Sequence, residues 1–265
     1  MNTIIKDPST GKLRGDNTDW IGIRDAVCAK LRKVERKHKT VSPATETRVC
    51  SPSTSHANVI MNVTMDPGTL LYRGNGPAYL PSIFADSKNN STIFVPKVGL
   101  VIGAGGTARA ACFALVQMGC QDIRIFNRTK SKAVALAKEF ANACAVDQLN
   151  SNEGGSLRGV EIVLCTVPAT AQFVLPTSIW AASNPPPRVV LDAAYRPRET
   201  RLLEQARIEG KGSSEAGGVA RVEGIDMLIM QGFGALRLWT GQSDLTPAVR
   251  AAVTRSVMQY YAESA

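Results

Sequence analysis

The sequence predicts an α/β protein built around a doubly wound parallel sheet. From residue 98 onward, short apolar runs alternate with stretches of helical periodicity, which is the pattern of successive β-α-β units. The runs within 98–102, 160–167 and 188–194 are apolar almost throughout, as expected for strands covered on both faces. A glycine-rich stretch separates the first run from the first helix, as is usual where such a sheet begins.

The first 36 residues predict one strand and one helix. A strand near Ile4 is followed by a polar turn and by the segment GDNTDW at 15–20. Ile23, Val27 and Leu31 then recur at i, i+4 and i+8, which places one apolar stripe on a helix.

Residues 37–97 differ in composition from the rest of the chain. Ser, Thr, Pro and Asn dominate and apolar residues are scattered, so we expect little regular structure. A connection of this length is uncommon inside a compact domain. The sequence leaves three explanations open: a disordered insertion, a lineage-specific loop, or an error in the gene model.

After this segment the expected elements follow one another closely. They are a strand at 98–102, a helix at 107–118 ending before Gly119, a strand at 122–126, a helix at 131–143, strands within 160–167 and 188–194, a helix at 202–209 ending at Gly210, and helices at 225–239 and 247–261. A glycine-rich loop at 210–218 precedes the last two helices, and no internal repeat is visible.

Composition argues against several classes of protein. No apolar run approaches the ~20 residues that a membrane helix needs, and the N-terminus lacks the features of a secretory signal, so we expect a soluble, cytoplasmic protein. The six cysteines are widely separated and only two histidines occur, so we expect neither a metal site nor a histidine-based catalytic pair. The net charge of +9 is unaccompanied by a nucleic-acid-binding motif. Its one dense basic run, at 30–39, is typical of a solvated helix end, with a binding patch as the alternative, and direct binding to nucleic acid is not expected.

Residues 98–109 read VGLVIGAGGTAR and carry a glycine motif. Gly103, Gly105 and Ala108 occupy the three small-residue positions of G-x-G-x-x-G/A. The order of strand, glycines and helix gives the motif its meaning, because glycines let the backbone approach a pyrophosphate closely while the helix N-terminus attracts its charge. The sequence therefore predicts a Rossmann domain that binds a dinucleotide.

The end of the second strand of this unit indicates which dinucleotide. NAD-binding domains place an Asp or Glu about 20 residues further on, where it accepts hydrogen bonds from the ribose. This chain has Asn127, Arg128 and Thr129 there, followed by Lys130 and Lys132, and no carboxylate. A guanidinium group pairs with phosphate through parallel hydrogen bonds and stacks on aromatic rings. The pattern favours NADP over NAD, with Arg128 on the 2′-phosphate.

Six segments together resemble the shikimate/quinate dehydrogenase family. They are NTI at 2–4, GDNTDW at 15–20, VIGAGGTARA at 101–110, FNRTKSK at 126–132, VLDAAYRPRET at 190–200 and MLIMQGFGALRLWTG at 227–241. The chain most resembles the dehydrogenase domain at the C-terminus of the fungal pentafunctional AROM polypeptide and the related fungal quinate repressor. The resemblance implies NADP as cofactor and hydride transfer to or from a ring acid such as shikimate, dehydroshikimate or quinate.

The resemblance also implies a site. Asp19 corresponds to the family's catalytic aspartate, which also binds substrate, and Asn2, Gln231 and Tyr195 correspond to substrate-binding positions. The cofactor positions are Gly103, Ala104, Gly105, Gly106, Thr107, Arg109, Asn127, Arg128, Thr129 and Lys132.

Four parts of the chain follow from the same resemblance. Residues 1–36 correspond to the end of the substrate-binding domain with its connecting helix, and 37–97 to an insertion of low order. Residues 98–222 correspond to the Rossmann domain, and 223–265 to terminal helices that return to the substrate domain.

The family's catalytic lysine lies before the NTI segment, as do the hydroxyl residues that hold the substrate carboxylate. The chain begins after them, so we expect most of the substrate-domain sheet to be missing and the strand near Ile4 to lack its partners. Without another chain to supply these residues, we expect no competent dehydrogenase. Two functions stay open: a fragment of an NADP-dependent dehydrogenase, or a non-catalytic sensor of the quinate-repressor type that binds ring acid or NADP and a regulatory protein partner.

Overall fold

The computed structural model describes residues 2–7, 9–39, 95–150, 155–180, 186–210, 218–241 and 247–263, and for 33–39 it describes the backbone. Residues 1–39 and 95–265 form one compact unit. The segment expected to have little regular structure, 37–97, lies outside the described residues except at its two ends.

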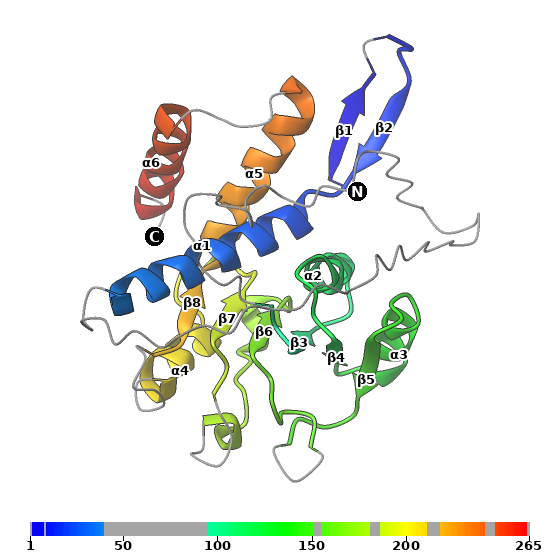
Figure 1. The fold of residues 1–265 in the computed structure, drawn as a ribbon, viewed down its shortest axis with the longest axis vertical. Helices are drawn as coiled ribbons and strands as arrows, with labels where there is room; N and C mark the ends of the chain where they lie inside the picture. The colour runs from blue at the N-terminus through cyan, green and yellow to red at the C-terminus, as the bar shows by residue number, and fades with distance from the viewer. Residues whose placement is uncertain are drawn as a thin grey trace, which may run out of the picture. The chain divides into compact units, whose positions relative to one another are not determined.

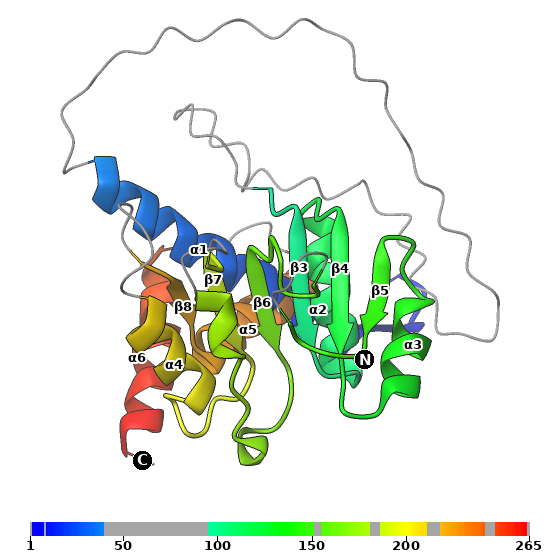
Figure 2. The ribbon, with the colours of Figure 1, turned by 90° about the horizontal axis from the view of Figure 1, so that it is seen from below.

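A six-stranded parallel sheet forms the centre of this unit, in the order β5-β4-β3-β6-β7-β8 (Figures 1 and 2). Because β4 and β5 lie on one side of β3 and β6 to β8 on the other, the order reverses between β3 and β6. Doubly wound sheets bind ligands at the carboxyl ends of the strands beside such a reversal. The predicted fold class is confirmed. The strands are β3 (Val98–Ile102), β4 (Asp122–Phe126), β5 (Ala143–Val146), β6 (Ile162–Cys165), β7 (Val189–Asp192) and β8 (Ala220–Val222).

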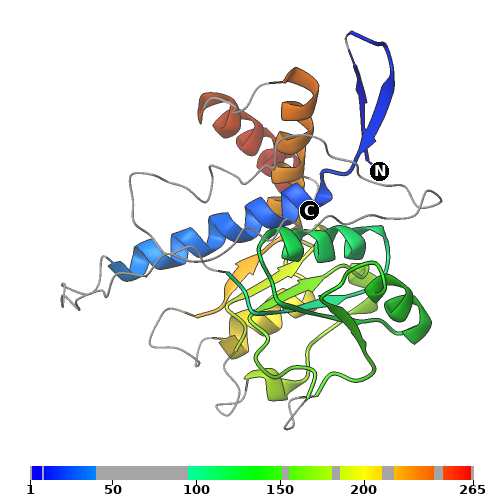
Figure 3. The ribbon, with the colours of Figure 1, turned by 45° about the vertical axis from the view of Figure 1, so that its right-hand side comes forward.

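Helices pack on both faces of this sheet. Helices α1 and α2 lie on one side of it and α4 on the other (Figure 3). Helix α1 also packs against α5, which brings the first and last parts of the described chain together. No helix in the described ranges has the length and apolar character needed to cross a membrane. The helices are α1 (Asp19–Lys39), α2 (Gly106–Gln117), α3 (Lys130–Ala137), α4 (Arg201–Glu209), α5 (Gly224–Thr240) and α6 (Pro247–Glu263), with short 3-10 turns at Ala169–Ala171 and Thr177–Trp180.

The main apolar core lies between the sheet and α4. Leu100 and Ile102 alternate along β3 and are buried in the same cluster as Leu202 and Leu203 of α4. Burying each such side chain contributes about 1.5–3 kcal/mol relative to leaving it in water. A smaller cluster that includes Phe233 joins α5 to α6.

The N-terminal strand has a partner that the sequence did not predict. β1 (Thr3–Lys6) pairs with β2 (Leu13–Asp16) in a separate antiparallel sheet, so the expectation that the strand near Ile4 lacks partners is wrong in this respect. The turn between them is held by Asp7, which accepts hydrogen bonds from the hydroxyl and the backbone N–H of Ser9 at 2.6 and 2.8 Å. These contacts, with the backbone N–H of the next residue, lower the pKa of Asp7 to about 2.

Two further strands correct the expected elements. The helix expected at 131–143 ends at Ala137, and the chain then forms β5 from Ala143 to Val146. Alanines run through this whole segment and favour helix locally, so no sequence signal marks the change. β8 also went unpredicted. Both strands form because they pair with a neighbour, β5 with β4 and β8 with β7.

Candidate cofactor and substrate site

The glycine turn follows β3 at the carboxyl edge of the sheet. The backbone of Gly103 has φ of 113°, a conformation that L side chains rarely adopt. A Cβ at this position would lie 2.4 Å from the Oγ1 atom of Thr166, at the end of β6. The N–H of Gly103 donates to the carbonyl of Phe126 at 2.8 Å, which ties the turn to the end of β4. Only glycine therefore fits here.

The next glycines leave open space above the start of α2. Gly105 and Gly106 are exposed, and a Cβ on either would meet no atom within 4 Å. Gly105 is the N-cap of α2, and no side chain caps the helix. The first N–H groups of α2 can therefore serve an anion, which is how helix N-termini bind pyrophosphate. Ala104 and Thr107 flank this cradle and are half-buried.

The basic segment lies beside the glycine turn. Ile102 pairs with Phe126 in the parallel register, so Asn127 and Arg128 leave β4 at the same edge. The Nδ2 atom of Asn127 donates to the carbonyl of Thr129 at 2.9 Å and shapes the turn into α3. Among the predicted cofactor residues of this segment, those with exposed side chains are Arg128, Thr129 and Lys132.

Arg109 forms an ion pair with a carboxylate of its own chain. Its Nε and Nη2 atoms donate to the two carboxylate oxygens of Glu139 at 2.6 Å each, and this partner raises the pKa of the guanidinium group. The sequence assigned Arg109 to the cofactor. In the structure it links the first turn of α2 to the residues that follow α3.

The predicted catalytic aspartate lies at the start of α1. The Nδ2 atom of Asn2 donates to Oδ1 of Asp19 at 2.7 Å, while Oδ1 of Asn2 accepts from the N–H of Thr18 at 2.9 Å. Burial raises the pKa of the Asp19 carboxyl above its ordinary value, and the Asn2 contact opposes this shift. Two residues predicted to share a site are thus in direct contact.

The other two predicted substrate residues lie on different elements. Gln231 of α5 packs on α1 one turn from Asp19: a Cβ on Gly22 would lie 3.0 Å from the Cβ of Gln231. Tyr195 is exposed and packs edge-on against Tyr261 of α6, with ring centroids 5.7 Å apart. Among the described residues, no hydrogen bond or ion pair joins Tyr195 to Asp19.

Two polar groups near these loops, one half-buried and one buried, were missed by the sequence analysis. The hydroxyl of Thr166 donates to the carbonyl of Ile102 at 2.8 Å beneath the glycine turn. Asp192 ends β7, is 4% exposed, and accepts hydrogen bonds from the Thr200 hydroxyl at 2.7 Å and the Ala194 N–H at 3.1 Å. Burial raises the pKa of Asp192. The available signal was the position of both residues at the ends of buried strands, where sites collect.

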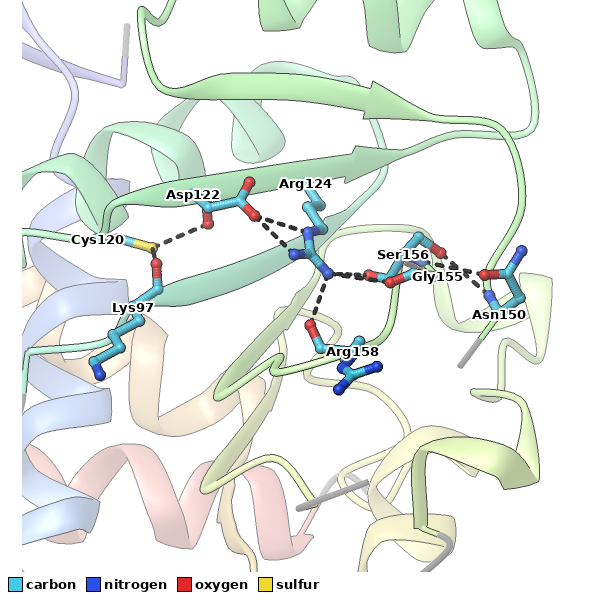
Figure 4. Close-up of polar contacts among 8 residues, drawn as sticks. All are labelled: Lys97, Cys120, Asp122, Arg124, Asn150, Gly155, Ser156 and Arg158. Carbon is cyan, nitrogen blue, oxygen red and sulfur yellow. Dashed lines mark hydrogen bonds and ion pairs between the residues drawn. The ribbon is translucent and has the colours of Figure 1, made fainter. Parts of the chain in front are cut away.

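The loop between β5 and β6 is fastened to the sheet by one side chain. Arg124 of β4 pairs with Asp122 and donates from Nη1 to the carbonyls of Ser156 and Arg158 at 2.9 and 2.8 Å (Figure 4). Asn150 and Ser156 close the loop through reciprocal hydrogen bonds of 3.1 and 3.2 Å (Figure 4). Among the described residues, no group of three or more His, Cys, Asp or Glu side chains is placed to hold a metal ion.

Comparison with known proteins shows which protein family this chain matches. Residues 88–206 match the family model of shikimate/quinate 5-dehydrogenases. The chain is 36% identical to an NADP(+) shikimate dehydrogenase of Natronomonas pharaonis, over 54% of this chain and 50% of that protein. It is 30% identical to the quinate repressor protein of Emericella nidulans, over 86% of this chain and 21% of that protein. The chain belongs to the shikimate/quinate dehydrogenase family.

Solved structures of this family share the fold. The dehydroquinate dehydratase and shikimate dehydrogenase from S. pombe AroM aligns with a TM-score of 0.56 at 24% identity, over 96% of this chain and 36% of that one. A quinate dehydrogenase from Corynebacterium glutamicum in complex with NAD aligns with a TM-score of 0.57 at 19% identity, over 97% and 66%. The chain spans half of the length of the shikimate dehydrogenase compared above and about a fifth of the length of the quinate repressor.

The dehydrogenase family match covers one side of the site. The glycine turn, the basic segment and Tyr195 lie inside the matched residues 88–206, whereas Asn2, Asp19 and Gln231 lie outside them. Assignment of those three positions depends on their motifs and on the contacts described above.

Proposed function

We propose that this chain is a dehydrogenase-type domain that binds NADP and a hydroxylated ring acid, namely shikimate, dehydroshikimate or quinate, in the cytoplasm. The observation that carries the proposal is the open glycine cradle at the start of α2 beside a strand end that holds Arg128 and no acid. A relative that is 36% identical over 54% of this chain is named for its use of NADP(+).

The cofactor fits these residues in two places. The open backbone at Gly105 and Gly106 would hold the pyrophosphate of NADP, and Gly103 provides the sharp turn after β3 that this requires. Arg128 and Lys132 offer their charges to the 2′-phosphate, which NAD lacks. When bound, NADP supplies a nicotinamide ring that accepts or donates a hydride.

The ring acid is assigned to the other side of the site. The raised pKa of Asp19 suits a carboxyl that takes and returns the proton of a ring hydroxyl, and Asn2 holds that carboxyl in one orientation. Gln231 contributes an amide from the adjacent helix, and Tyr195 an aromatic ring from the loop after β7.

Turnover by this chain alone is expected to be slow. Within the described residues, the side chain that hydrogen-bonds the Asp19 carboxylate is Asn2, and no lysine forms an ion pair with it. An acid–base pair with one member missing loses typically ~10²–10⁴-fold in rate. We therefore propose that this chain by itself is a dehydrogenase-type domain with little or no activity.

A second candidate is a sensor. The chain is 30% identical to the quinate repressor protein of Emericella nidulans over 86% of its length. In this case the same residues bind ring acid or NADP without turnover, and a regulatory protein responds to the bound state.

Calorimetry on the whole chain separates these possibilities. Titration with NADP and with NAD is expected to give a preference of about tenfold or more for NADP, since charge-assisted hydrogen bonds contribute ~1.5–3 kcal/mol each. Equal affinities, or no binding, would contradict the proposal.

Shikimate and quinate are then titrated with and without NADP, and reduced cofactor is followed in a steady-state assay. Ring-acid binding without turnover supports the sensor, and turnover that disappears in Asp19→Asn supports an active dehydrogenase.

A further inference from the structure

We propose that Asp147 sets how strongly the chain prefers NADP over NAD, by holding the Lys130 ammonium group away from the 2′-phosphate. The inference rests on the proposed NADP binding and adds to it a positioning residue. Neither the glycine motif nor the basic segment contains Asp147, which directly follows β5, the next strand along the sheet.

The register between β4 and β5 brings Asp147 to the carboxyl edge of the sheet, where the proposed cofactor residues lie. β5 pairs with β4 in parallel, with Val146 opposite Phe126, so Asp147 leaves β5 level with the point where Asn127 leaves β4. Lys130 is the first residue of α3, two positions after Arg128. Its Nζ atom lies 2.5 Å from Oδ2 of Asp147.

The charges at this edge are unequal. Arg128, Lys130 and Lys132 bring three cations to the start of α3, and Asp147 pairs with one of them. A phosphate that reaches this edge must either draw Lys130 away from its partner or bind beside the carboxylate. The first outcome breaks the Lys130–Asp147 ion pair, and the second places two negative groups within a Debye length of about 8–10 Å, so both weaken phosphate binding. NAD has no phosphate here and does not meet this cost.

The pair is accessible to a ligand. The Lys130 and Asp147 side chains are 64% and 56% exposed, and both line a hollow of about 570 Å³. The lining also includes Ser156, whose carbonyl accepts a hydrogen bond from Arg124, and Asn150, which hydrogen-bonds to Ser156 (Figure 4). The exposed Lys130 side chain is therefore accessible to a phosphate as an alternative partner.

Asp147→Asn tests the inference by calorimetry with NADP and NAD on the full-length chain. An exposed ion pair is worth up to about 1 kcal/mol, so NADP is expected to bind about three- to fivefold more tightly and NAD within about 1.5-fold of wild type. In 1 M salt, where the Debye length is about 3 Å, the variant and the wild type should bind NADP with nearly equal affinity. Glu204→Gln is the matched control, because it removes the acid of an exposed Arg201–Glu204 pair on α4.

Lys130→Gln shows whether Asp147 acts through Lys130. In the Lys130→Gln background, Asp147→Asn should raise NADP affinity by less than about twofold, because no ammonium group is left to release. The inference would be overturned if Asp147→Asn left the ratio of NADP affinity to NAD affinity unchanged, or if it raised NADP affinity by the same factor with Lys130 as with Gln at that position. Either result would leave NADP binding by the wild type intact. A wild type that binds neither cofactor would overturn the proposed function and this inference together.

Discussion

Arg128 is the side chain on which the proposed cofactor preference depends most. It is exposed at the end of β4, and no carboxylate lies in the segment from 126 to 132. Its neighbour Asn127 fixes the turn through its own backbone contact, so Arg128 can change without loss of that turn.

We expect Arg128→Asp to reverse the preference. NADP should bind at least about tenfold more weakly, because a charge-assisted contact of ~1.5–3 kcal/mol is replaced by repulsion. NAD should bind more tightly, because the new carboxylate can accept hydrogen bonds from the ribose hydroxyls. Calorimetry with both cofactors measures this. Arg201→Asp, at an exposed position on α4, is the control, and an equal loss of NADP affinity there would show that general charge is responsible.

Gly224 is required by packing. A Cβ at this position would lie 2.4 Å from the carbonyl oxygen of Ala194 and 2.6 Å from that of Ala193. These atoms are backbone and belong to the loop that carries Tyr195, so they cannot move aside cheaply.

Gly224→Ala should therefore destabilise the protein by about 1–3 kcal/mol, the usual cost of forcing a methyl group into a filled space. Gly232→Ala in the same helix has open space around its Cβ and should be neutral or stabilising by up to about 1 kcal/mol. Urea unfolding followed by circular dichroism measures both free energies. Similar values for the two variants would refute the packing argument.

At the scale of elements, one buried network joins β7 to α4. The Thr200 hydroxyl donates to Asp192 and accepts from the N–H of Leu203, so it caps α4 while it satisfies the carboxylate. The pKa of Asp192 in the folded protein is raised by burial. Its contribution to stability is thus complete below the ordinary pKa of an aspartate and is lost as pH rises through the folded value.

Thr200→Val should cost about 1–2 kcal/mol of stability at pH 7. Without the hydroxyl donor the pKa of Asp192 rises further, so the loss should shrink as pH falls towards 4 and the carboxyl becomes protonated. Thr200→Ser keeps the hydroxyl and should stay close to wild type. Urea unfolding at both pH values gives the comparison, and a loss independent of pH would show that Thr200 acts as a helix cap alone.

Strand and helix positions were predictable where periodicity was strong. The apolar runs became β3, β6 and β7, and the 3.6-residue stripe became α1. β5 and β8 were missed because their few residues carry little strand preference, and pairing with a central strand decided their conformation.

At the scale of the whole molecule, the described chain has its own sheet, core and candidate site in the unit formed by 1–39 and 95–265. Residues 40–94 fall outside that unit, and their composition predicts little regular structure.

Replacing residues 40–94 by a Gly/Ser linker of about 20 residues, with an average span of ~25 Å, should therefore leave NADP affinity within about twofold of the full chain. Calorimetry provides the measurement, and circular dichroism confirms that the variant folds. Loss of NADP binding by a folded variant would show that the segment contributes to the site.

The sequence alone determined the strand, glycine turn and helix at 98–117 and the basic end of β4, because these depend on local backbone conformation and on neighbouring residue types. The tertiary structure decided which distant side chains meet. It joined Asn2 to Asp19 across 17 positions, gave Arg109 to Glu139, and brought Asp147 to Lys130. The first depends on the pairing of β1 with β2, and the last on the order and register of β4 and β5 in the central sheet, and such pairings between segments are not encoded in any single segment.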